Sequence, residues 1–244
     1  MPSPFRCFPR RLFPFVFALV LSCTAQAGDR LLATGGAHQI EGAAGGGLVP
    51  WALIAGHGTR DQAGGSAFYT RVDTQDFNLV SYGVAPGLRD RVEVSFARQA
   101  LDASSVVPNA IGARSGSDTD FYDAATKVWL AGFLGRNVLA NATVRATRAN
   151  QFGLLGFGGD RKSSRSLQPE ASLAVMLTDN LVLGGDYRRK PDNLPVFKEE
   201  DASDVFLAWF LHRNVAVTLA WAKLGTVAGK AKQDGTYLSL QLTL

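Results

Sequence analysis

The sequence predicts an all-β protein, an up-and-down antiparallel transmembrane β-barrel of about twelve strands. Three observations predict it. Apolar and polar residues alternate along successive segments, the connections between those segments are alternately short and long, and the chain begins with a segment typical of exported proteins. The alternation identifies strands, the connections give their arrangement, and the first segment gives the compartment.

The clearest alternation lies at the end of the chain, in residues 237–244, YLSLQLTL. Every second residue from Leu238 onward is leucine, and these leucines alternate with Tyr237, Ser239, Gln241 and Thr243. Strand side chains point alternately to opposite faces, so this segment has one apolar face and one polar face. Residues 138–147 and 215–222 show the same period of two.

The short connections share a pattern of apolar residues, two polar residues, an Asn and apolar residues again. It occurs in FLGRNVLA (133–140), MLTDNLVL (176–183) and FLHRNVAV (210–217), and LRDRVEV (88–94) is a variant with Asp. Polar residues followed by Asn or Asp tolerate the backbone angles of tight turns. Each copy therefore predicts a hairpin.

Longer polar connections separate these hairpins, at residues 102–120, 149–165, 190–203 and 224–235. Alternate connections of an up-and-down sheet lie at opposite ends, so the tight turns should gather at one rim and the long loops at the other. Outer-membrane barrels have this asymmetry, with short periplasmic turns and long outer loops. A soluble periplasmic β protein, which would also alternate, is the competing interpretation.

Twelve strands are expected, because an even number returns both ends of the chain to one side. The segment 66–85 carries Asp-Thr-Gln-Asp in its middle and is either a hairpin or one bent strand, so ten strands is the alternative. The expected strands span residues 30–41, 48–57, 66–73, 75–85, 90–101, 121–134, 137–148, 166–178, 181–190, 203–212, 215–223 and 236–244.

Residues 1–27 are typical of a secretory signal peptide. Three arginines precede an apolar stretch, and Ala-Gln-Ala at 25–27 gives the small-x-small pattern of a cleavage site. The apolar stretch is shorter than the roughly 20 residues of a membrane-spanning helix. We therefore expect a signal peptide over 1–27 and a barrel over 28–244, in the outer membrane, with the periplasm as the alternative location.

Removal of the signal peptide changes the charge and the cysteine content. It takes away 3 of the 25 basic residues, so 22 basic residues remain against 21 acidic ones. This balance removes the main support for a nucleic-acid partner. Cys7 and Cys23 are both lost, so the remaining chain has no disulfide and no thiolate site.

Charged residues on the polar faces of the strands are the candidate lumen or pore residues. Buried charges must pair or meet water. Two interpretations follow: a water-filled channel that favours anionic solutes, or a closed barrel filled by salt-bridged side chains. The candidates are Arg91, Glu93, Lys127, Arg145, Glu170, Asp186, Arg188 and Lys223.

Residues 31–59 are dense in glycine. No Lys-Ser or Lys-Thr pair follows the glycines, so this is not a phosphate-binding loop. The segment is interpreted either as a first hairpin with a flexible loop at 42–47, which is the simpler reading, or as a stretch folded into the lumen. The plug or constriction candidates are Gly35, Gly36, His38 and Glu41.

Little in the sequence suggests catalysis. His38, His57 and His212 do not stand at a metal-binding spacing, so no metal or cofactor is expected. A hydrolase needs a serine, a histidine and an orienting group within reach of each other, and no G-x-S-x-G motif occurs. No catalytic residue is assigned, and a lipid-modifying barrel enzyme using His38 or His57 is kept as an alternative.

The glycine-dense stretch and residues 66–102, SAFYTRVDTQDFNLVSYGVAPGLRDRVEVSFARQALD, resemble an exported, β-rich family of proteobacterial proteins, domain of unknown function 3034. The resemblance covers most of the chain after residue 27 and implies export and a β-rich fold. It supplies no activity and no catalytic residue.

The sequence supports a small channel or passive transporter in the outer membrane. The alternatives are a non-conducting structural or interaction barrel, the lipid-modifying enzyme and the soluble periplasmic protein. The expected partners are outer-membrane lipid, the barrel-assembly machinery and small solutes.

Overall fold

The computed structural model describes residues 37–102, 118–196 and 198–244. The predicted signal peptide, with Gly35 and Gly36, lies outside these residues. Among the described residues no helix is long and apolar enough to cross a membrane. The described helical segment is a 3-10 turn, η2 (Asn150–Gly153).

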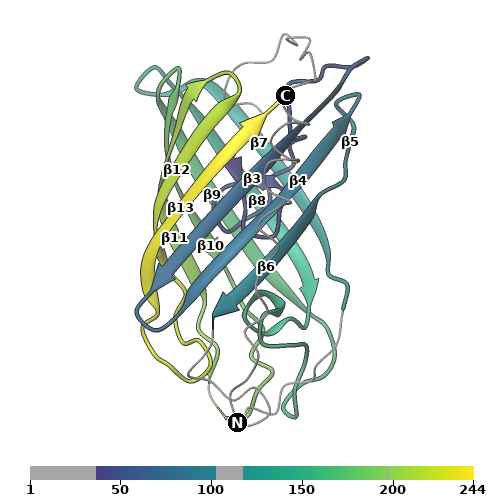
Figure 1. The fold of residues 1–244 in the computed structure, drawn as a ribbon, viewed down its shortest axis with the longest axis vertical. Coiled ribbons are helices and arrows are strands. Elements are labelled where there is room, and N and C mark those ends of the chain that lie inside the picture. Colours follow the sequence, from purple (N-terminus) through teal and green to yellow (C-terminus); the bar gives the residue numbers. More distant parts are fainter. Residues whose placement is uncertain (1–36, 103–117, 197) are drawn as a thin grey trace, which may run out of the picture.

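One antiparallel sheet makes up most of the structure (Figure 1). Its strands pair in the order β5-β4-β3-β13-β12-β11-β10-β9-β8-β7, and β6 also pairs with β4. The strands are β3 (Ala63–Thr74), β4 (Asn78–Leu88), β5 (Val92–Glu93), β6 (Phe96–Asp102), β7 (Phe121–Phe133), β8 (Arg136–Thr147), β9 (Ser166–Thr178), β10 (Leu181–Arg188), β11 (Ala202–His212), β12 (Val215–Lys223) and β13 (Asp234–Thr243).

The sheet curves into a barrel shape (Figure 1), and strand pairing does not close it within the described residues. β7 stands at one end of the pairing order, and β5 and β6 share the other end on β4. We call the junction between β5–β6 and β7 the seam. The all-β antiparallel prediction is confirmed, whereas closure of the wall by strand pairing is not observed.

The wall has fewer strands than the twelve expected. β5 and β6 pair with the two ends of β4 and are separated by Val94 and Ser95, so they form one interrupted strand. Counting them together reduces the 11-stranded sheet to ten wall strands, 11 − 1 = 10. The segment 66–85 is a hairpin, so the shortfall comes from the first two expected strands.

Residues 30–41 and 48–57 were expected to form those strands, and this expectation is wrong for their described parts. The described residues before β3 form only two short strands, β1 (Ala37–His38), within the first range, and β2 (Ala44–Gly45), between the two ranges, and these pair with each other apart from the main sheet. Residues 37–50 are buried, except for half-buried Glu41. A wall strand must expose every second residue, so this segment lies inside the curved sheet.

The predicted asymmetry of the two rims is present. The hairpin turns before β5, β8, β10 and β12 lie at one end, where β13 also ends, and the long connections lie at the other (Figure 1). One short turn departs from the rule: residues 75–77 join β3 to β4 at the long-loop rim.

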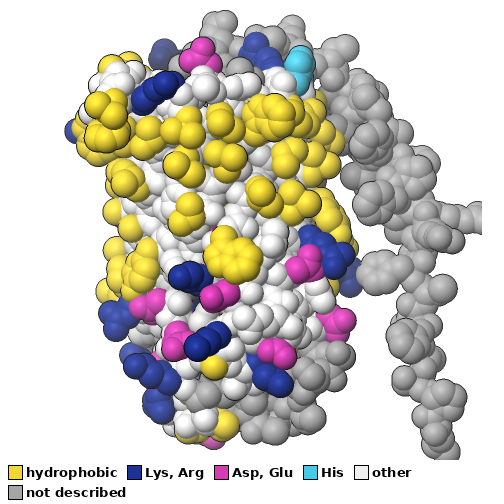
Figure 2. Space-filling model, turned by 90° about the vertical axis from the view of Figure 1, so that its left-hand side faces the viewer, with side chains coloured by type: hydrophobic (Ala, Val, Ile, Leu, Met, Phe, Trp, Pro, Cys, Tyr) yellow, Lys and Arg dark blue, Asp and Glu magenta, His cyan; other side chains and the backbone are white. Residues whose placement is uncertain are grey.

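The two faces of the sheet have opposite chemistry. In β13, Leu238 and Leu240 are exposed, whereas Tyr237, Ser239 and Gln241 are buried. β11 and β12 repeat the pattern, with large apolar side chains outside. Figure 2 shows a broad band of hydrophobic side chains across one face, with charged side chains gathered toward the long-loop rim.

Candidate functional site

The candidate site is the contact between the inward face of the sheet and residues 37–57, which we call the interior segment. One part of this contact is apolar. Ile40, Leu48, Val49 and Trp51 belong to the same buried cluster as Phe206 of β11. The other parts are polar, and they reach β3, β4, β5, β6, β7, β8, β10 and β13.

Glu41 stands between two arginines of the wall. Its carboxylate accepts two hydrogen bonds from Arg188 of β10, at 2.9 and 3.0 Å, and lies 3.3 Å from Arg145 of β8. Both arginines also pair with Glu170 of β9, at 2.6 and 3.3 Å. Burial opposes ionisation of Glu41, but Arg188 and Arg145 outweigh it and hold its pKa at about 2.

Two aspartates hold the glycine-rich part of the segment. Asp186 of β10 accepts hydrogen bonds from the backbone N–H groups of Leu48 and Val49, at 2.8 and 3.1 Å. A Cβ atom added to Gly46 would lie 2.3 Å from the Asp186 carboxylate, and one added to Gly47 would lie 2.5 Å from Asp204. Glycine is required here because the backbone approaches buried carboxylates this closely.

The end of the interior segment bridges the seam. Glu93 of β5 accepts the N–H groups of Ala44 and Ala55, at 3.2 and 2.7 Å. Ala52, three residues before Ala55, donates its N–H to Thr126 of β7 at 2.8 Å. Residues 52–55 therefore connect the two ends of the sheet where no strand ladder joins them.

His38 forms a buried pair with a wall serine. Its Nδ1 donates to the Gly42 carbonyl at 2.8 Å, so Nε2 is left to accept from the Ser66 hydroxyl of β3. The ring stacks on Phe68 at 4.6 Å, and burial lowers the pKa of His38 to about 4. His38 and Ser66 are only 1% and 7% exposed, so the pair has no access for a lipid substrate. The other candidate, His57, donates from Nε2 to the Arg213 carbonyl at 2.6 Å. Within the described ranges, no group of three or more His, Cys, Asp or Glu side chains is placed to hold a metal ion.

The structure places the lumen candidates on both faces. Arg145, Glu170, Asp186 and Arg188 are buried on the inward face, and Glu93 is half-buried at the seam. These five surround the interior segment. The two plug candidates within the described residues, His38 and Glu41, both belong to that segment.

Three of the candidates do not lie inside. Arg91 is exposed in the turn between β4 and β5. Lys223 follows Leu219 and Trp221 on the outward row of β12, and Lys127 lies outside on β7, 5.3 Å from the ring of Trp129. For Lys127 and Lys223 the inward placement was wrong because each lies on the same face of its strand as an exposed tryptophan two residues away, Trp129 and Trp221.

Several contact residues were not predicted. Asn141 and Thr143 of β8 both donate to the Pro50 carbonyl, at 3.1 Å, and Tyr237 of β13 donates to the His38 carbonyl at 2.9 Å. All three point to the same face of their strands as neighbouring residues that the sequence already marked as charged or polar. The two-residue period places them inside, but only the fold shows that they meet the interior segment.

A family model described as "Protein of unknown function (DUF3034)" matches residues 34–108 and 102–241. The chain belongs to the DUF3034 family. The match includes the whole interior segment and nearly all of the wall. Membership therefore covers the candidate site, while the description of DUF3034 gives it no activity.

Two further comparisons add little. No curated protein matches the chain. A solved structure titled "De novo design of transmembrane beta-barrels" matches with 6% identity and a TM-score of 0.30, over 74% of this chain and 95% of that chain. At this TM-score the similarity carries no argument about this DUF3034 protein.

Proposed function

We propose that the protein is an outer-membrane β-barrel whose passage for small solutes is closed by its own interior segment. One observation carries the proposal: large apolar side chains cover the outward face of the wall, while the inward face carries the charged and polar side chains together with an apolar cluster. A water-filled or plugged barrel in lipid requires this arrangement. A soluble barrel, which packs an apolar core, would have the opposite one.

The interior segment supports a closed passage that can open. Its polar contacts with the wall are hydrogen bonds and ion pairs, which water can replace when the segment moves. The wall that it would leave behind contains the hydrophilic residues Asn141, Thr143, Arg145 and Asp186 beside an apolar patch around Phe206. Such a lining suits a water-filled route.

The rim asymmetry supports an orientation. Short turns face the periplasm in outer-membrane barrels and long loops face outward. The tight-turn rim and the end of β13 would then lie on the periplasmic side. Outer-membrane lipid would contact the apolar band, and assembly of such a wall would use the cell's barrel-assembly machinery.

Disulfide locking in planar bilayers tests the proposal. Ala52→Cys with Thr126→Cys places two thiols where the backbone of the segment meets β7, in a chain without cysteine after residue 23. We expect the native protein to show current steps, the oxidised double variant to be silent, and reduction to restore the steps. Each single-cysteine variant is the control and should behave as the native protein.

Two results would contradict the proposal in different ways. Purified protein that remains dispersed in water without detergent would remove the membrane location. Absence of current from the native protein, with insertion verified by its heat-dependent migration on gels, would favour the non-conducting structural barrel.

A further inference from the structure

The charged side chains that face the interior from the wall are mostly negative. Within the described residues five carboxylates stand against two guanidinium groups, a balance of 2 − 5 = −3. The guanidinium groups belong to Arg145 and Arg188, and the carboxylates to Glu93, Asp120, Glu170, Asp186 and Asp204. Lys190 and Glu199, in the loop after β10, pair with each other at 3.2 Å and leave this balance unchanged.

Both arginines are already paired with part of the negative charge. Arg145 contacts Glu170 at 2.6 Å and Asp120 at 3.7 Å, and Arg188 contacts Glu170 at 3.3 Å. These two carboxylates balance the two arginines when the interior segment leaves. The other two buried carboxylates of the wall, Asp186 and Asp204, form no ion pair with a described arginine or lysine.

Asp186 and Asp204 face each other across adjacent strands. They are directly opposite in the ladder of β10 and β11, and the Asp186 N–H donates to Asp204 Oδ1 at 3.2 Å. Asp204 Oδ2 is buried and has no hydrogen-bond partner among the described residues. Two carboxylates in this position repel each other unless they share a cation or a proton.

The interior segment covers both aspartates in the closed state. Asp186 accepts the N–H groups of Leu48 and Val49, and Gly47 packs against Asp204. When the segment moves away, both carboxylates lose this cover and face the passage. A carboxylate that loses its donors is stabilised by water and by a positive charge.

Polar side chains of two further strands continue the row. Ser172 of β9 is opposite Asp186, Asn141 of β8 is opposite Ser172, and both are buried. Four neighbouring strands therefore bring oxygen atoms to one level of the interior. Oxygen atoms of this kind are the ligands that hard cations prefer.

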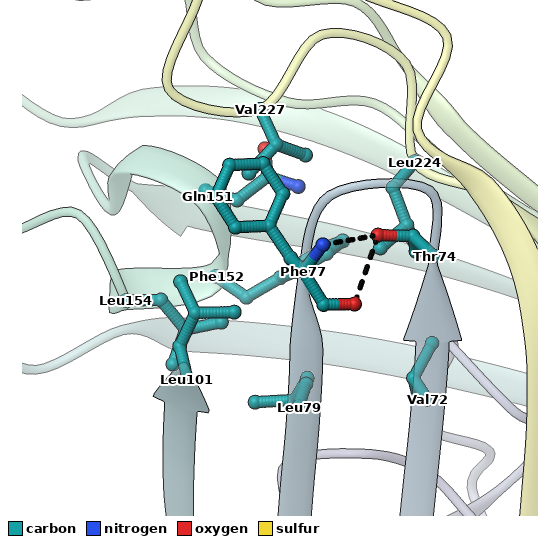
Figure 3. Close-up of a pocket in the computed structure, with 10 residues that line it drawn as sticks. All are labelled: Val72, Thr74, Phe77, Leu79, Leu101, Gln151, Phe152, Leu154, Leu224 and Val227. Carbon is teal, nitrogen blue, oxygen red and sulfur yellow. Dashed lines mark hydrogen bonds between the residues drawn. The ribbon is translucent and has the colours of Figure 1, made fainter. Parts of the chain in front are cut away.

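The lining at the long-loop rim does not oppose this charge. A water-sized pocket there is lined by eight apolar residues with Thr74 and Gln151, none of them charged (Figure 3). Charges of one sign in a confined passage concentrate counter-ions and exclude ions of their own sign. The two aspartates would therefore decide which ions the opened passage admits.

We propose that the opened passage selects small cations, and that Asp186 and Asp204 determine this specificity. The inference rests on the proposed function and deepens it by giving the class of solute. The sequence favoured anionic solutes because Arg91, Lys127 and Lys223 were expected inside, and all three lie outside the interior.

Reversal potentials in planar bilayers under a KCl gradient test the assignment. The native protein should pass K⁺ about tenfold better than Cl⁻, the lower end of the counter-ion enrichment in a cleft of one charge sign. The reversal potential reports which ion crosses an open channel, and it does not depend on how often the channel opens. Equal permeabilities, or a preference for Cl⁻, would overturn the inference and leave the passage standing, whereas absence of current would remove both.

Two variants locate the selectivity. Asp186→Asn with Asp204→Asn removes both charges at nearly constant volume, so the K⁺ to Cl⁻ permeability ratio should fall from about ten toward one. Asp204→Asn alone breaks no hydrogen bond to the interior segment and should lower the ratio part of the way. Asp73→Asn, on the outward face of β3, is the matched control and should keep the native ratio. An unchanged ratio in the double variant would refute the role of the two aspartates, and Asp204→Asn decides by the same measure if the double variant does not insert.

Discussion

Glu41 and Arg188, separated by 147 residues in the sequence, form a two-point hydrogen-bonded ion pair between the interior segment and the wall. Planar pairing of this kind fixes direction as well as distance. The pair does not stand alone, because Glu170 contacts the same arginine from β9. Asp120 lies 3.7 Å from Arg145, so the two arginines keep two carboxylates of the wall when the segment leaves.

The first prediction concerns this pair. Glu41→Gln removes the charge of the segment and leaves Arg145 and Arg188 paired with Glu170. We expect the free energy of unfolding to fall by about 2 kcal/mol, the scale of a hydrogen bond to a charged group, and the open time in planar bilayers to rise. Asp73→Asn, which neutralises an exposed ion pair with Arg71, is the control and should change neither quantity. Unchanged open time in Glu41→Gln would argue against a role of this pair in closure.

The second prediction concerns the glycine-rich backbone. In Gly46→Ala the new Cβ would lie within 2.7 Å of three carboxyl atoms of Asp186, so the carboxylate must move and lose its bonds to Leu48 and Val49. Overpacking of this kind costs about 1–3 kcal/mol. Thermal unfolding should show the loss, and limited proteolysis should cut the segment faster. Gly135→Asn, in an open turn with φ of 73°, is the comparison and should cost much less.

The third prediction is a pH dependence. Burial lowers the pKa of His38 from 6.5 to about 4, so the unfolded chain binds a proton before the folded protein does. The stability contribution is complete above pH 6.5 and is lost as the pH falls toward 4, by about 3 kcal/mol. Unfolding measured in steps from pH 7.5 to 4.5 should show this loss. His38→Gln should flatten the curve over that window, and an equally steep curve in the variant would assign the dependence to other groups.

The fourth prediction concerns the outward face. Leu240 lies on the exposed row of β13, so Leu240→Arg places a cation in the apolar band. An arginine facing lipid costs about 2–4 kcal/mol near the middle of a bilayer. We expect less folded protein in the membrane fraction and loss of heat-dependent migration on gels. Ser164→Arg, in the exposed loop after β8, adds the same charge and should have no effect.

Much of the wall could be predicted from the sequence. The period of two in residues 138–147 and 237–243 gives both the strands and the direction of each side chain, because that geometry depends only on the backbone of a strand. The same rule, applied to Lys127 and Lys223, would have placed both outside beside Trp129 and Trp221. Those errors came from assigning charged residues to the interior without following the alternation of inward and outward side chains along each strand.

The interior segment could not be predicted in this way. Its residues have no alternating pattern, because a segment that is surrounded by the wall on all sides has small and apolar residues at consecutive positions. Glycines that suggested a flexible loop at 42–47 instead permit contact with Asp186 and Asp204. The facing of Asp186 and Asp204 was also beyond prediction, since a long connection leaves the register of β10 against β11 open.

By itself the sequence determined an antiparallel all-β wall with short turns at one rim, long loops at the other, and apolar side chains on one face. These follow from local periodicity and turn chemistry, which act over a few residues. The tertiary structure alone decided that residues 37–57 fill the interior and that Glu41 meets Arg188. Such contacts join residues far apart in the chain, and only the curvature of the whole sheet brings their side chains within hydrogen-bonding distance.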